Sequence, residues 1–197
     1  MVGDGLRALR DAGPLGRVRQ NRNVIGFALS ELHHPLRLRT AVGAYRDGIA
    51  RQNALFLRQQ VDDVTDAMRH AGTSALVVDR LMERGAKPSV AARFMRRLGE
   101  AHERDSDLPL GSAHRIASER MDLHNNDLGI GIAVQRVSNR LAGRAAASPA
   151  GDQALEGAVL RALANGRALV LDAPTAPIRA TTRAELTALL RDPSVIA

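Results

Sequence analysis

The sequence has 197 residues, of which 45% are hydrophobic and 2% aromatic; this excludes a disordered chain and favours a core of Leu, Val, Ala, Ile and Met. It contains no cysteine, which excludes disulfide bonds, cysteine-ligated zinc and thiol catalysis. The formal net charge of +7 comes almost entirely from scattered arginines, and few aromatic residues could stack on bases. Specific nucleic-acid binding is therefore not supported, whereas attraction to anionic lipid or an acidic partner protein stays open.

In the first half of the chain, apolar spacing and breaker residues predict helices at 23–32, 41–58, 61–84 and 89–104. The first helix is expected to end before Pro35, because the residue before a proline disfavours helical geometry. The pattern over 61–84 is the strongest, with apolar residues at three- and four-residue steps and Gly85 at its end. Pro88 suits the opening of the next helix.

The second half predicts helices at 112–121, from 125 or 126 to about 141 before Gly143, at 151–165 and at 182–190. In this reading Asn125 is either an N-cap or part of a longer helix. Ala168–Asp172 (A-L-V-L-D) is the one good strand candidate, and a proline-rich loop follows it. Thr182 and Glu185 have the spacing of a capping box.

These elements predict a mainly α, single-domain helical bundle, either without strands or with a small β-hairpin near the C-terminus. Residues 1–22 are expected to form a loose leader, and 23–197 one helical domain with its motif core at 62–140. We see neither an apolar run long enough to span a membrane nor a Sec signal. The expectation is a protein made soluble in the cytoplasm, whose export would need a dedicated secretion system.

Three short segments concentrate side chains that can do chemistry. The first is D-A-M-R-H-A at 66–71, in the strongest predicted helix, and the second is G-E-A-H-E at 99–103. His102 and Glu103 are adjacent, so at most one of them faces the interior of a helical bundle. The zincin motif H-E-x-x-H is not present, since residue 106 is serine.

The third segment is M-D-L-H-N-N-D-L-G-I-G-I-A at 121–133, which is unusually polar before an apolar stretch. If it is helical, its polar residues divide between two faces. One face carries a carboxylate, two amides and a glycine that permits close helix packing: Asp122, Asn125, Asn126 and Gly129. His124 and Asp127 then point elsewhere.

Taken in order, these segments resemble a bacterial family of domains of unknown function. Its members carry D-A-x-R-H-A/C, then D-A-H-E, then M-D-L-x-N-N-x-x-G, often as terminal modules of secreted or toxin-like proteins. The resemblance covers about residues 62–140. Two departures are Glu100, where aspartate often precedes Ala-His-Glu, and Gly72-Thr73, where an aromatic pair is usual.

The resemblance implies that seven polar residues converge between three helices: Arg69, His70, His102, Glu103, Asp122, Asn125 and Asn126. In a catalytic interpretation His70 or His102 is a general base, assisted by Asp122 or Glu103, and Arg69 and the two asparagines bind substrate. His70, His102 and Asp122 are also candidate ligands of a divalent metal. In a structural interpretation the same groups form a hydrogen-bonded network that fixes the helices.

Two functions follow as hypotheses. The first is a hydrolytic effector or toxin domain acting on a phosphate-bearing substrate, with a cognate immunity or chaperone protein as partner. The second is a non-enzymatic binding module whose basic surface docks a partner protein or a membrane. The sequence does not decide whether the protein is an enzyme or whether it needs a cofactor.

Overall fold

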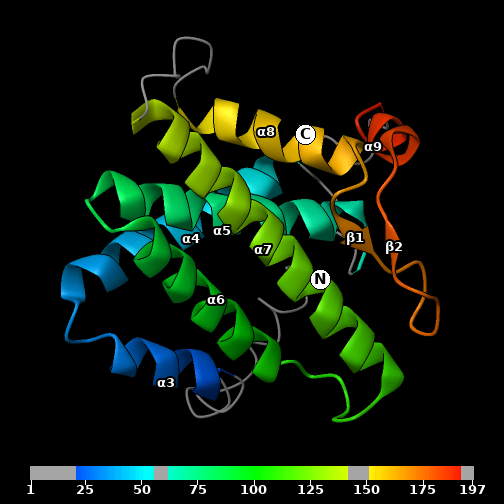
Figure 1. Ribbon diagram of the computed structural model, residues 1–197. Helices are drawn as coiled ribbons and strands as arrows, with labels where there is room; N and C mark the ends of the chain where they lie inside the picture. The colour runs from blue at the N-terminus through cyan, green and yellow to red at the C-terminus, as the bar shows by residue number, and fades with distance from the viewer. Residues whose placement is uncertain (1–20, 56–61, 142–150, 192–197) are drawn as a thin grey trace.

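The computed structural model of the chain describes residues 21–55, 62–141 and 151–191, which form a helical bundle with one small hairpin (Figure 1). Its helices are α3 (Arg22–Ser30), α4 (Pro35–Leu55), α5 (Val64–Glu83), α6 (Pro88–Arg104), α7 (Ala113–Leu141), α8 (Asp152–Ala164) and α9 (Arg183–Leu189). Strands β1 (Leu169–Val170) and β2 (Arg179–Ala180) pair antiparallel. The predicted mainly α fold with a hairpin near the C-terminus is confirmed.

Most helix ends lie within a few residues of their predicted positions. Gly85 has a left-handed φ of 87°, Pro88 is the first residue of α6, and Thr182 and Glu185 form the capping box that opens α9. The start of α4 was predicted wrongly, at residue 41. The helix begins at Pro35, because a proline is tolerated in the first turn, where its missing N–H has no partner to lose. The predicted leader, apart from residues 21–22, and residues 56–58 of the predicted second helix lie outside the described residues.

Helix α7 decides between the two interpretations of Asn125: two helices with a break after residue 121 are wrong, and the longer helix is confirmed. It is one continuous helix of 29 residues. Asp122, Asn125 and Asn126 have low helix propensity, but all three side chains are buried between elements, and these tertiary contacts outweigh propensity. Asn125 is therefore not an N-cap.

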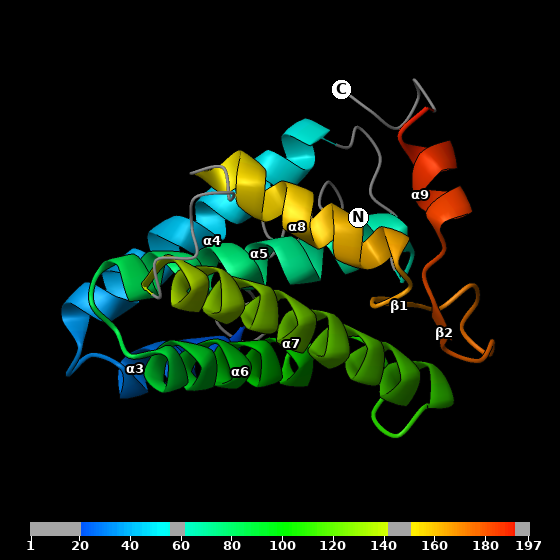
Figure 2. The same cartoon turned by 45° about the horizontal axis from the view of Figure 1, so that its top comes forward.

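Helix α5 is the central element of the bundle. It packs against α4, α6, α7, α8 and β1, and α6 and α7 run side by side along it (Figure 2). Of its 20 residues, only Arg69, Gly72, Arg80 and Glu83 are not buried. The Asp63 carboxylate caps its N-terminus by accepting hydrogen bonds from the backbone N–H groups of Thr65 and Asp66.

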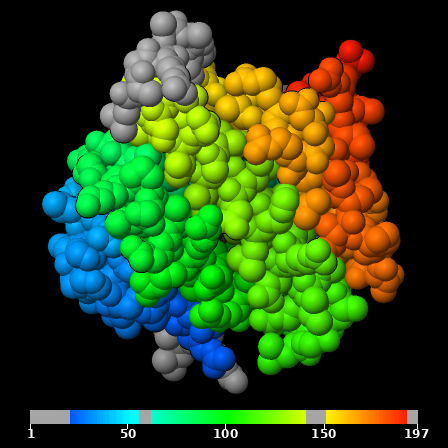
Figure 3. All heavy atoms as spheres, in the orientation of Figure 1, coloured from blue at the N-terminus to red at the C-terminus, as the bar shows by residue number. Residues whose placement is uncertain are grey.

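The core around α5 is aliphatic, as the composition predicts. Its largest fully buried side chains include Met68, Leu81, Met121, Ile130 and Leu163. In the view of Figure 3, side chains of α6 and α7 cover the centre of one face, and the hairpin and α9 lie at its edge. None of the described helices is both long enough and apolar enough to cross a membrane.

The backbones of α5 and α7 come unusually close at Gly129. A Cβ atom built on Gly129 would lie 2.0 Å from the carbonyl oxygen of Ala71, which is far inside any allowed contact. The expectation that this glycine permits close packing is confirmed. The contact places the polar face of α7 directly against α5.

We expect Gly129→Ala to lower the free energy of unfolding by about 3 kcal/mol or more, because the new methyl group collides with rigid backbone. Gly131→Ala is the matched control: it lies two residues further along the same helix, and a Cβ there meets nothing within 4 Å. The control should be neutral or stabilised by up to about 1 kcal/mol, since alanine favours helix. Equal effects of the two substitutions in urea unfolding would show that the α5–α7 contact can relax.

Candidate functional site

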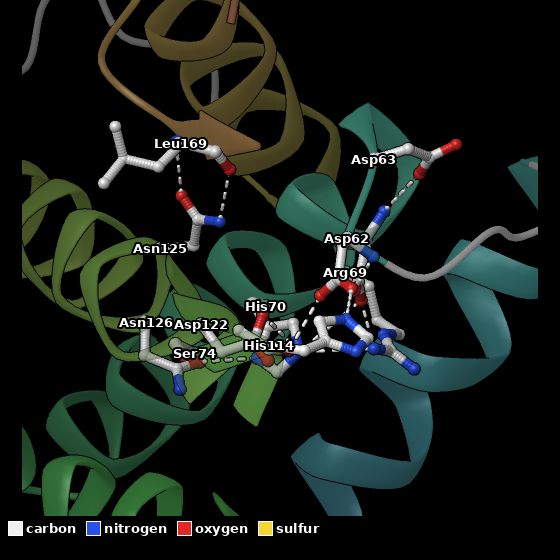
Figure 4. Close-up of polar contacts among 12 residues, drawn as sticks. Asp62, Asp63, Arg69, His70, Ser74, His114, Asp122, Asn125, Asn126 and Leu169 are labelled. Carbon is white, nitrogen blue, oxygen red and sulfur yellow. Dashed lines mark hydrogen bonds and ion pairs between the residues drawn. The ribbon is translucent and has the colours of Figure 1, made fainter. Parts of the chain in front are cut away.

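The candidate site lies where α5, α6 and α7 meet, and Figure 4 shows its members on α5 and α7. His70 comes from α5, His102 and Glu103 from α6, and Asp122 and Asn126 from α7. The rings of His70 and His102 have their centroids 6.3 Å apart. The predicted convergence of three segments far apart in the sequence is therefore seen for these residues.

Hydrogen bonds on one side of the His70 ring decide which nitrogen carries the hydrogen. Nδ1 lies 3.4 Å from Oδ1 of Asn126, and the same oxygen accepts a hydrogen bond of 2.7 Å from the Ser74 hydroxyl. With the amide in this orientation its oxygen only accepts, so Nδ1 of His70 is the donor. The neutral ring then presents Nε2 as a lone pair on its other side.

Nε2 of His70 faces two carboxylates and a guanidinium. It lies 3.5 Å from Oδ1 of Asp66, 3.3 Å from Oδ1 of Asp122 and 3.2 Å from a terminal nitrogen of Arg69. Arg69 also forms an ion pair with Asp66, one turn earlier on α5. The Arg69 guanidinium thus supplies positive charge to a point where lone pairs converge.

The protonation of this cluster is shifted by burial. Burial lowers the pKa of His70 to about 4, and the positive charge of Arg69 contributes, although Asp66 opposes the shift. Burial raises the pKa of Glu103 to about 8, with further contributions from the charges of Asp66 and Glu119. Burial, Asp66 and Glu103 raise the pKa of Asp122 in the same way. At neutral pH His70 is therefore neutral and Glu103 largely protonated.

His102 and Glu103 divide between solvent and interior, as their adjacency predicts. Glu103 is only 6% exposed, whereas His102 is exposed. The pKa of His102 is lowered by burial among neighbouring atoms and by the charge of Arg69. The charges of Asp105 and Asp66 oppose this shift. A neutral, accessible imidazole is able to accept a proton from water or substrate.

Asn125 has a different place from the other predicted site residues. Its amide oxygen accepts a hydrogen bond of 2.9 Å from the N–H of Leu169, and its amide nitrogen donates one of 2.9 Å to the Leu169 carbonyl. Both groups pair with β1, away from His70 (Figure 4). We assign this amide to holding the hairpin on α7 and leave it out of the proposed site. His124 and Asp127 point elsewhere, as expected, and contact Arg167 and Arg96.

Asp62 connects the cluster to its surroundings and was not predicted. Its carboxylate accepts hydrogen bonds from Ser118 (2.7 Å) and faces His114 at 2.9 Å, both on α7. Its backbone N–H donates to Oδ2 of Asp66 at 2.7 Å. Asp62 has a left-handed φ of 66°, and it is the one non-glycine residue with positive φ among those the structure describes. These contacts fix Asp66 in its position beside His70.

The residues able to hold a metal differ in one member from the predicted set of His70, His102 and Asp122. Asp66, His70 and Asp122 each offer a ligand atom, and these atoms lie within 4.8 Å of one another. Asp66 therefore replaces His102 in the set of candidate metal ligands. A sequence signal for it exists, because Asp66 lies four residues before His70 and hence on the same helix face. Nothing in the sequence indicates the contacts of Asp62, which depend on the approach of a distant helix.

Comparison with known proteins identifies a family but no activity. A family model described as a domain of unknown function (DUF6973) matches residues 29–148, which is more than half of the chain and includes all three polar segments. The chain belongs to this family. No curated protein and no solved structure matches the sequence.

The raised pKa of Glu103 predicts a pH dependence of stability. Its folded-state pKa is about 8 against 4.5 for the free group, so the folded chain binds more protons between these values and stability falls as pH rises. The lowered pKa of His70 acts oppositely, but only between about 4 and 6.5. From pH 6.5 to 8 we therefore expect the free energy of unfolding to fall, with EDTA present to exclude bound metal ions. Glu103 contributes at most about 1.4 kcal/mol per pH unit to this fall.

Glu103→Gln should flatten this fall, as measured by urea unfolding across the same pH range. Glu100→Gln, at an exposed position of the same helix, is the control and should keep the wild-type slope. A wild-type slope in Glu103→Gln would mean that Glu103 does not cause the fall, which would then belong to another group such as Asp122, whose pKa burial also raises.

Proposed function

We propose that this member of the DUF6973 family is a hydrolase that cleaves a phosphate-bearing substrate, as an effector or toxin domain with a cognate immunity or chaperone protein as partner. The observation that carries this proposal is the polar cluster between α5, α6 and α7. Asp66, His70, Glu103, Asp122 and Asn126 are all buried there. Burying so many polar groups costs stability, and such clusters are typical of sites where the groups are used.

The groups able to touch a substrate are those at the solvent edge of the cluster. The Arg69 side chain is 27% exposed, and His102 is exposed. A guanidinium binds phosphate oxygens in a bidentate manner and stabilises negative charge that develops on them. His102 accepts the proton of the attacking water and returns it to the leaving oxygen.

The buried groups form the inner part of the site. Asp66 and Nε2 of His70 hold the Arg69 guanidinium, and the Asp122 carboxylate lies 3.3 Å from the same nitrogen, so positive charge lies at the point against which the substrate phosphate binds. Asn126 fixes the orientation of His70 through Nδ1. In this proposal the inner groups position charge, while Arg69 and His102 act on the substrate.

The alternative function, a binding module, is favoured by a different observation. Leu29, Leu32 and Leu36 are 61%, 58% and 78% exposed around the end of α3 and the start of α4. Exposed leucines close together in the sequence suit contact with a partner protein. The basic charge gives less support, because arginines such as Arg80, Arg96 and Arg97 are paired with carboxylates.

Growth of a bacterial host distinguishes the two functions. We expect wild-type protein to inhibit growth in the cytoplasm or when directed to the periplasm, and His102→Ala to abolish the inhibition by removing the proton acceptor. The compartment affected narrows the substrate. His33→Ala, at another exposed histidine, is the control and should remain toxic.

Circular dichroism and soluble yield should show that both variants fold. Wild-type toxicity that persists in folded His102→Ala would contradict the assigned role of His102. Absence of toxicity in both compartments, together with no cleavage of phosphodiester or phospholipid substrates into their alcohol and phosphomonoester products, would favour the binding module.

A further inference from the structure

Three electron-rich atoms converge at one point of the cluster. Nε2 of His70 presents its lone pair, and Oδ1 of Asp66 and Oδ1 of Asp122 lie 3.5 and 3.3 Å from it. Lone pairs at these distances repel one another unless a proton or a cation lies between them. This arrangement therefore favours the binding of a proton or a cation between the three atoms.

Two further observations point to a ligand at this place. Oδ1 of Asp122 is buried and accepts no hydrogen bond from the described residues, and the residue as a whole is 6% exposed. His70 is held by Asn126 on its opposite nitrogen, and Ser74 in turn holds Asn126. Metal-binding histidines are usually oriented by such an outer hydrogen bond, which leaves the other nitrogen free to coordinate.

We propose that Asp66, His70 and Asp122 bind a divalent transition-metal ion of the zinc type, which displaces the Arg69 guanidinium towards solvent. The proposal stands on the positions of these side chains and does not require that the protein be a hydrolase.

The observed spacing suits zinc. A tetrahedral zinc ion with bonds of about 2.0–2.2 Å separates its nitrogen and oxygen ligands by about 3.3–3.5 Å. The distances from Nε2 to the two carboxylate oxygens are 3.3 and 3.5 Å, and all three ligand atoms lie within 4.8 Å of one another. One imidazole with two carboxylates also suits zinc better than magnesium, which prefers oxygen ligands alone.

Arg69 is placed to exchange with the ion. Its terminal nitrogen contacts both Asp66 and Nε2 of His70, so its positive charge lies beside the point where the ligands meet. The side chain is 27% exposed, which gives the displaced guanidinium a route to solvent. There it could bind a phosphate that also approaches the ion.

The catalytic consequence of the ion rests on the proposed function. Three protein ligands leave a fourth position for water, whose pKa zinc lowers to about 7. In hydrolysis this water loses a proton to His102 and its oxygen bonds to phosphorus. The bond from phosphorus to the leaving oxygen breaks, and that oxygen takes up the proton from His102. One water is consumed and nothing is oxidised or reduced.

The test is Zn²⁺ binding to the full chain after removal of metals with EDTA, measured by calorimetry and thermal unfolding. Wild type should bind one Zn²⁺ with a rise in Tm. Asp122→Asn keeps the shape but removes a ligand charge, and should weaken binding by more than the roughly 10- to 100-fold typical of losing an outer-shell partner. Arg69→Gln removes the competing cation, so its Tm should be lower than wild type in EDTA and rise further with Zn²⁺.

Controls separate this site from others. His33→Ala disrupts the exposed pair of His33 and His34 and should bind Zn²⁺ as wild type does. The proposal would be overturned if wild type and folded Asp122→Asn bound Zn²⁺ equally well. It would also be overturned if Zn²⁺ raised the Tm of neither wild type nor Arg69→Gln. If Asp122→Asn does not fold, the enhanced response of Arg69→Gln decides alone. Zn²⁺ binding without hydrolysis would refute the proposed function and leave the metal site standing.

Discussion

The close contact between α5 and α7 at Gly129 is the constraint on which the candidate site depends. Only glycine fits there, because a Cβ would lie 2.0 Å from the Ala71 carbonyl oxygen. Asn126 and Asp122 lie three and seven residues before Gly129 on the same face of α7. On α5, His70 and Ser74 lie on either side of Ala71 along the chain. Short side chains such as Ser, Asn and Asp meet only when their backbones are this close, so a side chain at 129 would separate the groups that orient His70.

This packing also brings several carboxyl groups close to His70. Asp66, Glu103 and Asp122 are brought into one buried region, where the Arg69 guanidinium forms an ion pair with Asp66. Coulomb repulsion between carboxylates is strong where water is excluded, so each added negative charge raises the affinity of the others for protons or cations. The raised pKa values of Glu103 and Asp122 express this affinity for protons. An ion bound at Asp66, His70 and Asp122 would satisfy the same affinity.

More of the candidate site could be predicted from the sequence than of the long-range contacts that hold its helices in place. The periodicity of α5 and the shared face of Asp122, Asn126 and Gly129 required only helical geometry, and both are present in the structure. The break predicted before Asn125 was wrong, because low helix propensity was weighed without the tertiary contacts that bury the residue. The pairing of Asn125 with Leu169 joins residues 44 apart, and no local pattern encodes it. The same holds for Asp62, whose partners on α7 are brought to it by the fold.

Two pairs of adjacent residues connect the buried polar cluster to the surface of the bundle. Successive residues of a helix point about 100° apart, so a pair at the edge of a buried stripe directs one side chain inwards and one outwards. On α5, His70 is buried and Arg69 partly exposed; on α6, Glu103 is buried and His102 exposed. In the proposed function the outward members, Arg69 and His102, bind phosphate and accept a proton, and the inward members lie among the carboxylates. Under that proposal a substrate does not need to enter the core, since each outer side chain lies beside a buried one on the same turn of helix.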